Sequence, residues 1–269
     1  MRIAVCVKHV PDVQSERRFE DGRVVRGEDD VLNELDENAV EEAVSLVEAH
    51  GGEVVAVSMG PEDAHDAVMR ALQMGADRGV LICDDRLGGS DAIGTAAVLA
   101  AAVRRLAADA PVDLVLTGMA SLDGMTSMMP AALAAELGLP LLGLAHAMEV
   151  SGGEGAWRVR VERSADGFDD VLEAPAPAVV SVTDQINEPR YPSFATMKAA
   201  RSKPVDQWDL DDLADFEGGQ DLAAAAEDGL SAIQVLEAAE NIRSGPGTII
   251  ADSGDAGERL ARYLVEEAL

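Results

Sequence analysis

The stretch VDLVLTGMASLDGMTSMMPAALAAELGLP, residues 112–140, decides the fold. It predicts a buried strand over Val112 to Leu116, a loop that carries Gly118 and Asp123, and an apolar helix that ends near Gly138. In open α/β sheets, ligands bind outside the carboxyl ends of strands, where free N–H groups and helix dipoles favour a phosphate. We therefore hypothesise a nucleotide site at residues 118–129. A plain strand–helix connection is the alternative, because the loop has neither a Walker motif nor GxGxxG.

The segments on both sides of this stretch repeat the strand-then-helix pattern. Short apolar runs rich in Val and Ile predict buried strands, and longer segments with one apolar face predict helices. The predicted strands are residues 2–7, 53–59, 79–83 and 178–183, and the predicted helices are residues 33–50, 62–74 and 90–106. This alternation indicates the α/β class, with a Rossmann-like, doubly wound, mostly parallel sheet.

The pattern changes after Pro140. Residues 142–150 and 157–163 look strand-like and indicate antiparallel edge strands added to the sheet. We assign residues 1–184 to an α/β core and residues 185–269 to a C-terminal arm. In the arm, residues 207–228 are acidic and expected to be weakly structured, residues 230–242 and 256–268 are expected helices, and residues 248–251 are an expected strand.

The charge balance limits the possible partners and localisation. The chain of 269 residues has 50 acidic and 21 basic side chains and a net charge of −29, so nucleic acid and anionic membranes are repelled. Lysine occurs only at Lys8, Lys198 and Lys203. We interpret this composition as adaptation to a cytosol of high salt, with an ordinary acidic protein as the alternative. Because there is neither a signal peptide nor a long apolar run, we expect a cytoplasmic protein without direct membrane insertion.

Residues that could carry catalysis or bind a metal are sparse. Cys6 and Cys83 lie in apolar runs and form neither a disulfide framework nor a metal motif. The four histidines, at positions 9, 50, 65 and 146, are scattered, and we expect them at the surface or at helix ends. We therefore predict no catalytic residues and no metal site.

Several motifs together resemble one known family. They are RIAVCVKHVPD (2–12), NELDENAVEEAVSL (33–46), VVAVSMGP (54–61), ALQMGADRGVLI (71–82), and NEPRY (187–191) followed by Met197-Lys198-Ala199. In this order they resemble the β subunit of electron transfer flavoproteins (ETF). NEPRY is the most specific match, because it has no evident general structural reason to recur.

This resemblance implies a heterodimer with an ETF α subunit that holds the redox FAD. The β subunit would hold AMP, or a second FAD in electron-bifurcating relatives, in a fold of adenine-nucleotide-binding type. By position, the cofactor-binding residues would be Cys6, Asn33, Glu34, Leu35, Asp36, Met59, Gly118, Asp123, Gly124, Met125, Thr126, Ser127, Met128 and Met129.

The nucleotide loop departs from the family pattern. The family usually has a sequence close to Asp-Gly-Asp-Thr-Gly-Gln-Val, so Met125 replaces an acid and Met128 replaces a glutamine. Backbone N–H groups and the hydroxyls of Thr126 and Ser127 remain as donors. We therefore favour AMP over a flavin, and the alternative is a loop that has become apolar core.

Residues near 190–200 resemble the family's loop that docks partner dehydrogenases. Phe194 stands at its apolar anchor position, where Leu is common, and a buried packing residue is the alternative. The docking residues implied by the resemblance are Arg190, Tyr191, Pro192, Phe194, Met197 and Lys198.

The resemblance implies electron carriage without a catalytic step in this chain. Electrons would pass from dehydrogenases of the acyl-CoA type, through FAD, to a membrane ETF:quinone oxidoreductase. The alternatives are a β subunit of a bifurcating, NADH-oxidising flavoprotein, and a stand-alone adenine-nucleotide-binding module.

The halophilic interpretation predicts that the stability of the folded chain depends on salt. Molar KCl screens repulsion between the surface carboxylates, because the Debye length falls to about 3 Å. We expect the thermal midpoint to rise between low and molar KCl, measured by circular dichroism. An unchanged midpoint would contradict the halophilic interpretation.

Overall fold

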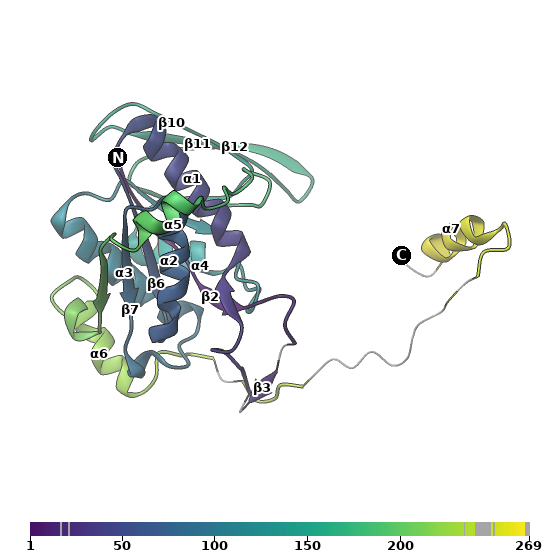
Figure 1. The fold of residues 1–269 in the computed structure, drawn as a ribbon, viewed down its shortest axis with the longest axis horizontal. Helices are drawn as coiled ribbons and strands as arrows, with labels where there is room; N and C mark the ends of the chain where they lie inside the picture. The colour runs from purple at the N-terminus through teal and green to yellow at the C-terminus, as the bar shows by residue number, and fades with distance from the viewer. Residues whose placement is uncertain (17, 21, 234, 240–248, 250, 267–269) are drawn as a thin grey trace.

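The computed structural model describes residues 1–16, 18–20, 22–233, 235–239, 249 and 251–266. A seven-stranded parallel sheet lies at its centre, in the order β14-β7-β6-β1-β8-β13-β9, with helices on both faces (Figure 1). The predicted α/β, doubly wound parallel fold is confirmed. The strands are β1 (Arg2–Cys6), β6 (Glu53–Met59), β7 (Arg78–Ile82), β8 (Leu114–Gly118), β9 (Leu141–Ala145), β13 (Ala178–Val182) and β14 (Val205–Trp208).

The two faces of the sheet have separate hydrophobic cores. Successive residues of a strand point to opposite faces, so Ile3 and Val5 of β1 pack on one side and Ala4 and Cys6 on the other. The first face is covered by α1 (Glu34–His50) and α2 (His65–Met74), and the second by α3 (Ala92–Asp109), α4 (Met129–Leu137) and α6 (Gly219–Glu227). Because helices cover both faces of the sheet, the side chains on both sides of the central strands are buried, and these strands are therefore apolar almost throughout.

The order of the strands creates a switch point between β1 and β8. From β1 the chain adds β6 and β7 on one side, then crosses to β8 on the other side of β1. The connections that follow β1 and β8 therefore diverge at the carboxyl edge of the sheet, which is where such folds bind ligands.

The expected antiparallel strands pair with one another rather than with the main sheet. β10 (Ala147–Ser151), β11 (Arg158–Ala165) and β12 (Phe168–Pro175) form a three-stranded sheet. The segment predicted as one strand over 142–150 is divided, because its first half is the parallel strand β9 and its second half is β10.

Along the chain, two small antiparallel ribbons come between β1 and α1. In one, β2 (His9–Pro11) pairs with β5 (Asp30–Leu32), and in the other β3 (Phe19–Glu20) pairs with β4 (Arg23–Val24). Short 3-10 turns are η1 (Glu62–Ala64), η2 (Asp85–Leu87) and η3 (Asp211–Leu213).

The segment after residue 185 contributes more structure than predicted. It forms α5 (Phe194–Ala200), then β14, which pairs with β7. The expectation that residues 207–228 are weakly structured was wrong, because Trp208 and Leu222 are buried in the second core despite their acidic neighbours. The Arg105 guanidinium lies 4.1 Å from the centroid of the Trp208 ring and adds a cation–π contact.

The predictions for the end of the chain have mixed outcomes. Residues 230–233 and 235–239 are not helical, so the helix expected over 230–242 is wrong in its described part, and residues 240–242 lie outside the described residues. Residues 249 and 251 are not in a strand, and residues 248 and 250 of that predicted strand lie outside the description. Helix α7 (Ala256–Glu266) agrees with the predicted final helix, of which residues 267 and 268 are not described, and it lies apart from the sheet in Figure 1.

Gly79 tests how closely β7 packs between α2 and β14. A Cβ at this position would lie 2.3 Å from Cγ1 of Val68 and 3.3 Å from Cγ2 of Val205. We expect Gly79→Ala to lower the free energy of unfolding by about 1–3 kcal/mol, because the surrounding core must shift. Urea titration measures this change. Gly153→Ala is the control, because a Cβ there meets nothing within 4 Å, and an equal loss in both variants would contradict the packing argument.

Candidate nucleotide site and docking surface

The residues expected to bind a nucleotide lie around the carboxyl edge of the sheet. Cys6, Met59 and Gly118 are the last residues of β1, β6 and β8. Gly118 leads into the loop 119–128 and then into α4, while α1 begins at Glu34. The sequence prediction that these segments meet at one edge agrees with the fold, and the place is the switch point between β1 and β8.

Asn33 connects the start of α1 to the loop after β8. Its Nδ2 donates to the carbonyl oxygen of Ala120 at 2.9 Å, and its Oδ1 accepts from the N–H of Leu122 at 3.0 Å. The side chain makes no capping bond to α1. At this helix start Glu34 is exposed and Leu35 is half-buried.

Asp36 is a buried carboxylate directly behind the loop. Its Oδ2 accepts from the backbone N–H of Lys8 at 2.9 Å, and a Cβ on Gly118 would lie only 2.5 Å from its Oδ1. Burial raises the pKa of Asp36 to about 7, although hydrogen bonds from Asn33, Lys8 and Gly118 oppose the shift. Burial, with the nearby Asp36 charge, also raises the pKa of the Cys6 thiol to about 12, so Cys6 is an inert core residue.

Asp123 is held by two cations that sequence reasoning did not assign to the site. Lys8 Nζ lies 2.9 Å from its Oδ2, and Arg26 donates to the same carboxylate. The Asp123 side chain is only 2% exposed. Burial opposes ionisation, but the Lys8 charge and the hydrogen bonds from Arg26 and Lys8 outweigh it and hold the pKa of Asp123 well below its usual range. A lysine directly after a buried strand was the available signal for Lys8, whereas nothing in the sequence singled out Arg26.

The crest of the loop, residues 124–128, is exposed. Met125 is 63% and Met128 43% exposed, so the alternative in which the loop has become apolar core does not hold. Met125 and Ser127 adopt left-handed φ values of 50° and 51°, a conformation that costs energy for residues other than glycine. Such strain recurs where a loop must present its backbone to a ligand.

The crest still offers hydrogen-bond donors. Gly124 N–H donates to Asp123 and Met125 N–H donates to Ser121. Among the described residues, the N–H groups of Thr126, Ser127 and Met129 have no protein acceptor. Met129 begins α4, so its N–H lies at the positive end of a helix dipole. These donors suit a phosphate or another anion.

The expected docking residues divide into anchors and exposed side chains. Arg190 donates to Glu41 and Glu48 of α1, and Pro192 is buried, so both fix the segment to the core. Asn187 also bonds to α1, through Asn38 and Glu42. NEPRY therefore has a structural reason to recur, which the sequence analysis missed.

Beyond these anchors the segment turns apolar side chains outward. Tyr191 is 90% and Phe194 79% exposed, and Met197 is 39% exposed beside the exposed Lys198. The alternative in which Phe194 is a buried packing residue is therefore wrong. Phe194 starts α5, whose first turn is capped by Ser193 through Thr196 N–H.

Comparison with known proteins places this arrangement in a family. The family model described as the electron transfer flavoprotein domain matches residues 21–213. A Mycobacterium leprae protein named electron transfer flavoprotein subunit beta is 38% identical over 275 residues, covering 99% of this chain and 98% of that protein. The chain belongs to the electron transfer flavoprotein β-subunit family.

Other relatives extend the comparison. A Clostridium acetobutylicum protein of the same name is 35% identical over 79% of this chain and 80% of its own length. Protein FixA of Azorhizobium caulinodans is 36% identical over 76% of this chain and 74% of its own length. In the part of the chain that the structure describes, no helix is long and apolar enough to cross a membrane.

Asp36 gives the chain a measurable pH dependence. Its pKa is about 7 in the folded chain against 3.8 for the unfolded one, so the folded chain binds more protons between these values. This contribution to stability is complete below the unfolded pKa and is lost as the pH rises through about 7. We expect the free energy of unfolding to fall more steeply from about pH 5 to about pH 8 in the wild type than in Asp36→Asn, which cannot ionise. Urea titrations along this range measure it, and parallel curves would contradict a raised pKa.

Proposed function

We propose that this chain seats AMP at the loop 118–129 and acts as the structural half of a heterodimeric electron carrier. The observation that carries the proposal is the exposed loop crest at the switch point, with unpaired N–H groups on Thr126, Ser127 and Met129. Lys8 and Arg26 neutralise Asp123 beside this crest, which lowers the electrostatic cost of bringing a phosphate close.

The recognition of AMP rests on the backbone rather than on polar side chains. Met125 and Met128 offer no hydrogen-bond donors, so phosphate binding depends on N–H groups and the α4 dipole. A second flavin needs more polar recognition than this loop offers, which favours AMP over the bifurcating alternative. When bound, AMP supplies no redox chemistry, and the chain's own residues act only to bind and to shield.

Membership of the β-subunit family implies that the partner of this chain is an ETF α subunit. The proposed ETF α subunit holds the redox FAD, and this chain clasps it with its C-terminal arm. Helix α7 supports a clasp, because Leu260, Tyr263, Leu264 and Val265 are each more than half exposed there. An apolar helix surface of this kind is stable when another chain covers it.

Phe194 is the proposed contact for dehydrogenases of the acyl-CoA type. Its exposed ring, held by the anchored segment before it, provides an aromatic hot spot. Electrons would then pass from the dehydrogenase through FAD of the α subunit to a membrane ETF:quinone oxidoreductase. We propose that this takes place in a cytoplasm of high salt, given the net charge of −29.

Nucleotide content tests this proposal. We expect the chain, copurified with the proposed ETF α subunit and then denatured, to release one FAD and one AMP per heterodimer, measured by chromatography. Two FAD would support the bifurcating alternative. A chain that purifies without any α subunit would support a stand-alone module, and no nucleotide beyond one FAD would overturn the AMP site.

Two variants separate backbone from side-chain recognition. Asn33→Ala removes both bonds that hold the loop, and we expect it to weaken AMP binding by roughly tenfold. Thr126→Val keeps the N–H group and should retain AMP. Loss of AMP in Thr126→Val alone would show that the hydroxyl, not the backbone, carries the recognition.

A further inference from the structure

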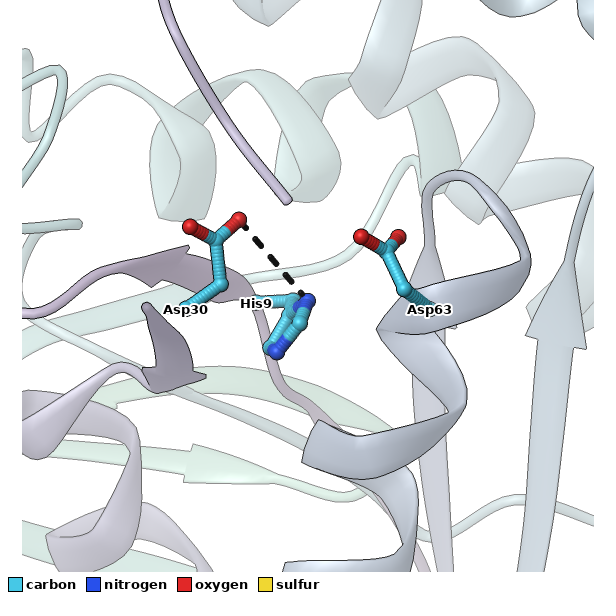
Figure 2. A group of neighbouring side chains, drawn as sticks. All are labelled: His9, Asp30 and Asp63. Carbon is cyan, nitrogen blue, oxygen red and sulfur yellow. Dashed lines mark ion pairs between the residues drawn. The ribbon is translucent and has the colours of Figure 1, made fainter. Parts of the chain in front are cut away.

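Three side chains outside the nucleotide site converge at one point (Figure 2). His9 comes from β2, Asp30 from the paired strand β5, and Asp63 from the turn η1. One potential ligand atom from each lies within 4.8 Å of the other two. The sequence places these residues far apart, and only the fold brings them together, so the expectation that His9 lies at the surface or at a helix end was wrong.

His9 is a buried imidazole without a hydrogen-bond partner. Its side chain is 8% exposed and that of Asp30 is 5% exposed. Its Nδ1 lies 4.0 Å from Asp30 Oδ2, too far for a hydrogen bond, and its Nε2 is buried with no partner among the described residues. A buried polar atom left unpaired is costly, so both ring nitrogens require an explanation, and a ligand in the gap beside Asp30 would satisfy Nδ1, not Nε2.

The orientation of the ring indicates what would pair with it. In Figure 2 the imidazole lies between the two carboxylates, and the nitrogen joined to Asp30 by the dashed line faces the gap between them. Asp63 is exposed, so the gap is open to solvent on one side. Three atoms within 4.8 Å of one another have a central point no more than about 2.8 Å from each, close to the bond lengths of about 2.0–2.2 Å for zinc with N and O ligands.

Asp63 has acidic neighbours on one side. Together with Glu62, Asp84 and Asp85 it lies close enough to the thiol of Cys83 for its charge to add to the effect of burial in raising the pKa of that thiol. Asp84 is paired with Arg86, whereas among the described residues Asp30 has no Lys or Arg partner and lies beside the His9 ring alone. Two carboxylates facing one another without a bound cation repel each other.

We propose that His9, Asp30 and Asp63 form a binding site for a divalent transition-metal ion of the zinc class. One imidazole nitrogen and two carboxylate oxygens match the mixed N and O ligands that Zn²⁺ accepts, whereas Ca²⁺ and Mg²⁺ prefer oxygen alone. Closing the site requires each ligand to move by less than about 1 Å, and the exposed Asp63 can follow the ion.

A metal here would tie the β2–β5 ribbon to the body of the fold at η1. The chain between the two strands includes Arg26, which reaches Asp123 in the nucleotide loop. Gly27 passes over η1, since a Cβ on it would lie 3.2 Å from Asp63 Oδ2.

Metal titration of the full-length chain tests the site. After treatment with EDTA in molar KCl, the chain is titrated with Zn²⁺ against a chromophoric chelator, and Co²⁺ is used in parallel for its visible spectrum. We expect one Zn²⁺ per chain. Asp63→Asn and His9→Gln should each weaken binding by at least tenfold, because each removes a ligand.

Two controls keep the result specific. Asp66→Asn makes the same change of charge at an exposed position in the first turn of α2, and Cys83→Ser removes a thiol that could bind Zn²⁺ on its own. Both should bind Zn²⁺ like the wild type. Because Asp63 is exposed, its variant should fold normally, as checked by circular dichroism. No binding by the wild type, unchanged binding in Asp63→Asn, or equal weakening in Asp66→Asn or Cys83→Ser would overturn the proposal.

Discussion

The close approach of helix α1 to the end of strand β8 is the contact on which the rest of the site depends. A Cβ on Gly118 would lie 2.5 Å from Asp36 Oδ1 and 2.7 Å from the carbonyl oxygen of Leu35, so a side chain there would separate the two elements. This approach buries Asp36 and brings Asn33 within reach of Ala120 and Leu122. The loop is therefore fixed at its base by α1 and left exposed only at its crest, where a ligand can reach the backbone.

Helix α1 also supports the proposed docking surface. Asn38, Glu41 and Glu48 lie along its length and hold Asn187 and Arg190. The burial of Glu41 opposes its ionisation, but the Arg190 hydrogen bonds outweigh this and lower its pKa, so the pair is charged at neutral pH. One rigid helix thus positions the nucleotide loop at its start and the segment that leads to Phe194 along its side. A substitution inside α1 would therefore alter the position of both the loop after β8 and the segment that leads to Phe194, although the two are far apart in the sequence.

The sequence predicted the five central strands of the parallel sheet well, because they are buried on both faces and such strands are apolar almost throughout. The family resemblance assigned Cys6, Asn33, Asp36 and Gly118 to one site, and these residues lie together in the fold because all of them are at strand ends or at the facing helix start. The sequence-based prediction failed at β14, where the pattern of burial depends on Trp208 alone in an acidic context. It could not anticipate the partners of Asp123 or the convergence of His9, Asp30 and Asp63, because these contacts join segments whose distance is set only by the folded chain. The structural reason for NEPRY could not be predicted from the sequence either, because it is the set of bonds between Arg190 and the α1 residues Glu41 and Glu48.

Strand β14 has a mechanical consequence for helix α5, which begins with Phe194. Before Phe194 the chain is fastened to α1 by Arg190, and after it Lys203 Nζ donates to the carbonyl oxygen of Leu72 while β14 joins the sheet beside β7. A segment fastened at both ends behaves as a short arch rather than as a loose tail. Tension applied at the C-terminus meets first the buried contacts of α6 and η3 with the second core and then the β14–β7 ladder, before it reaches α5. The orientation of the Phe194 side chain therefore does not depend on the position of the distal arm.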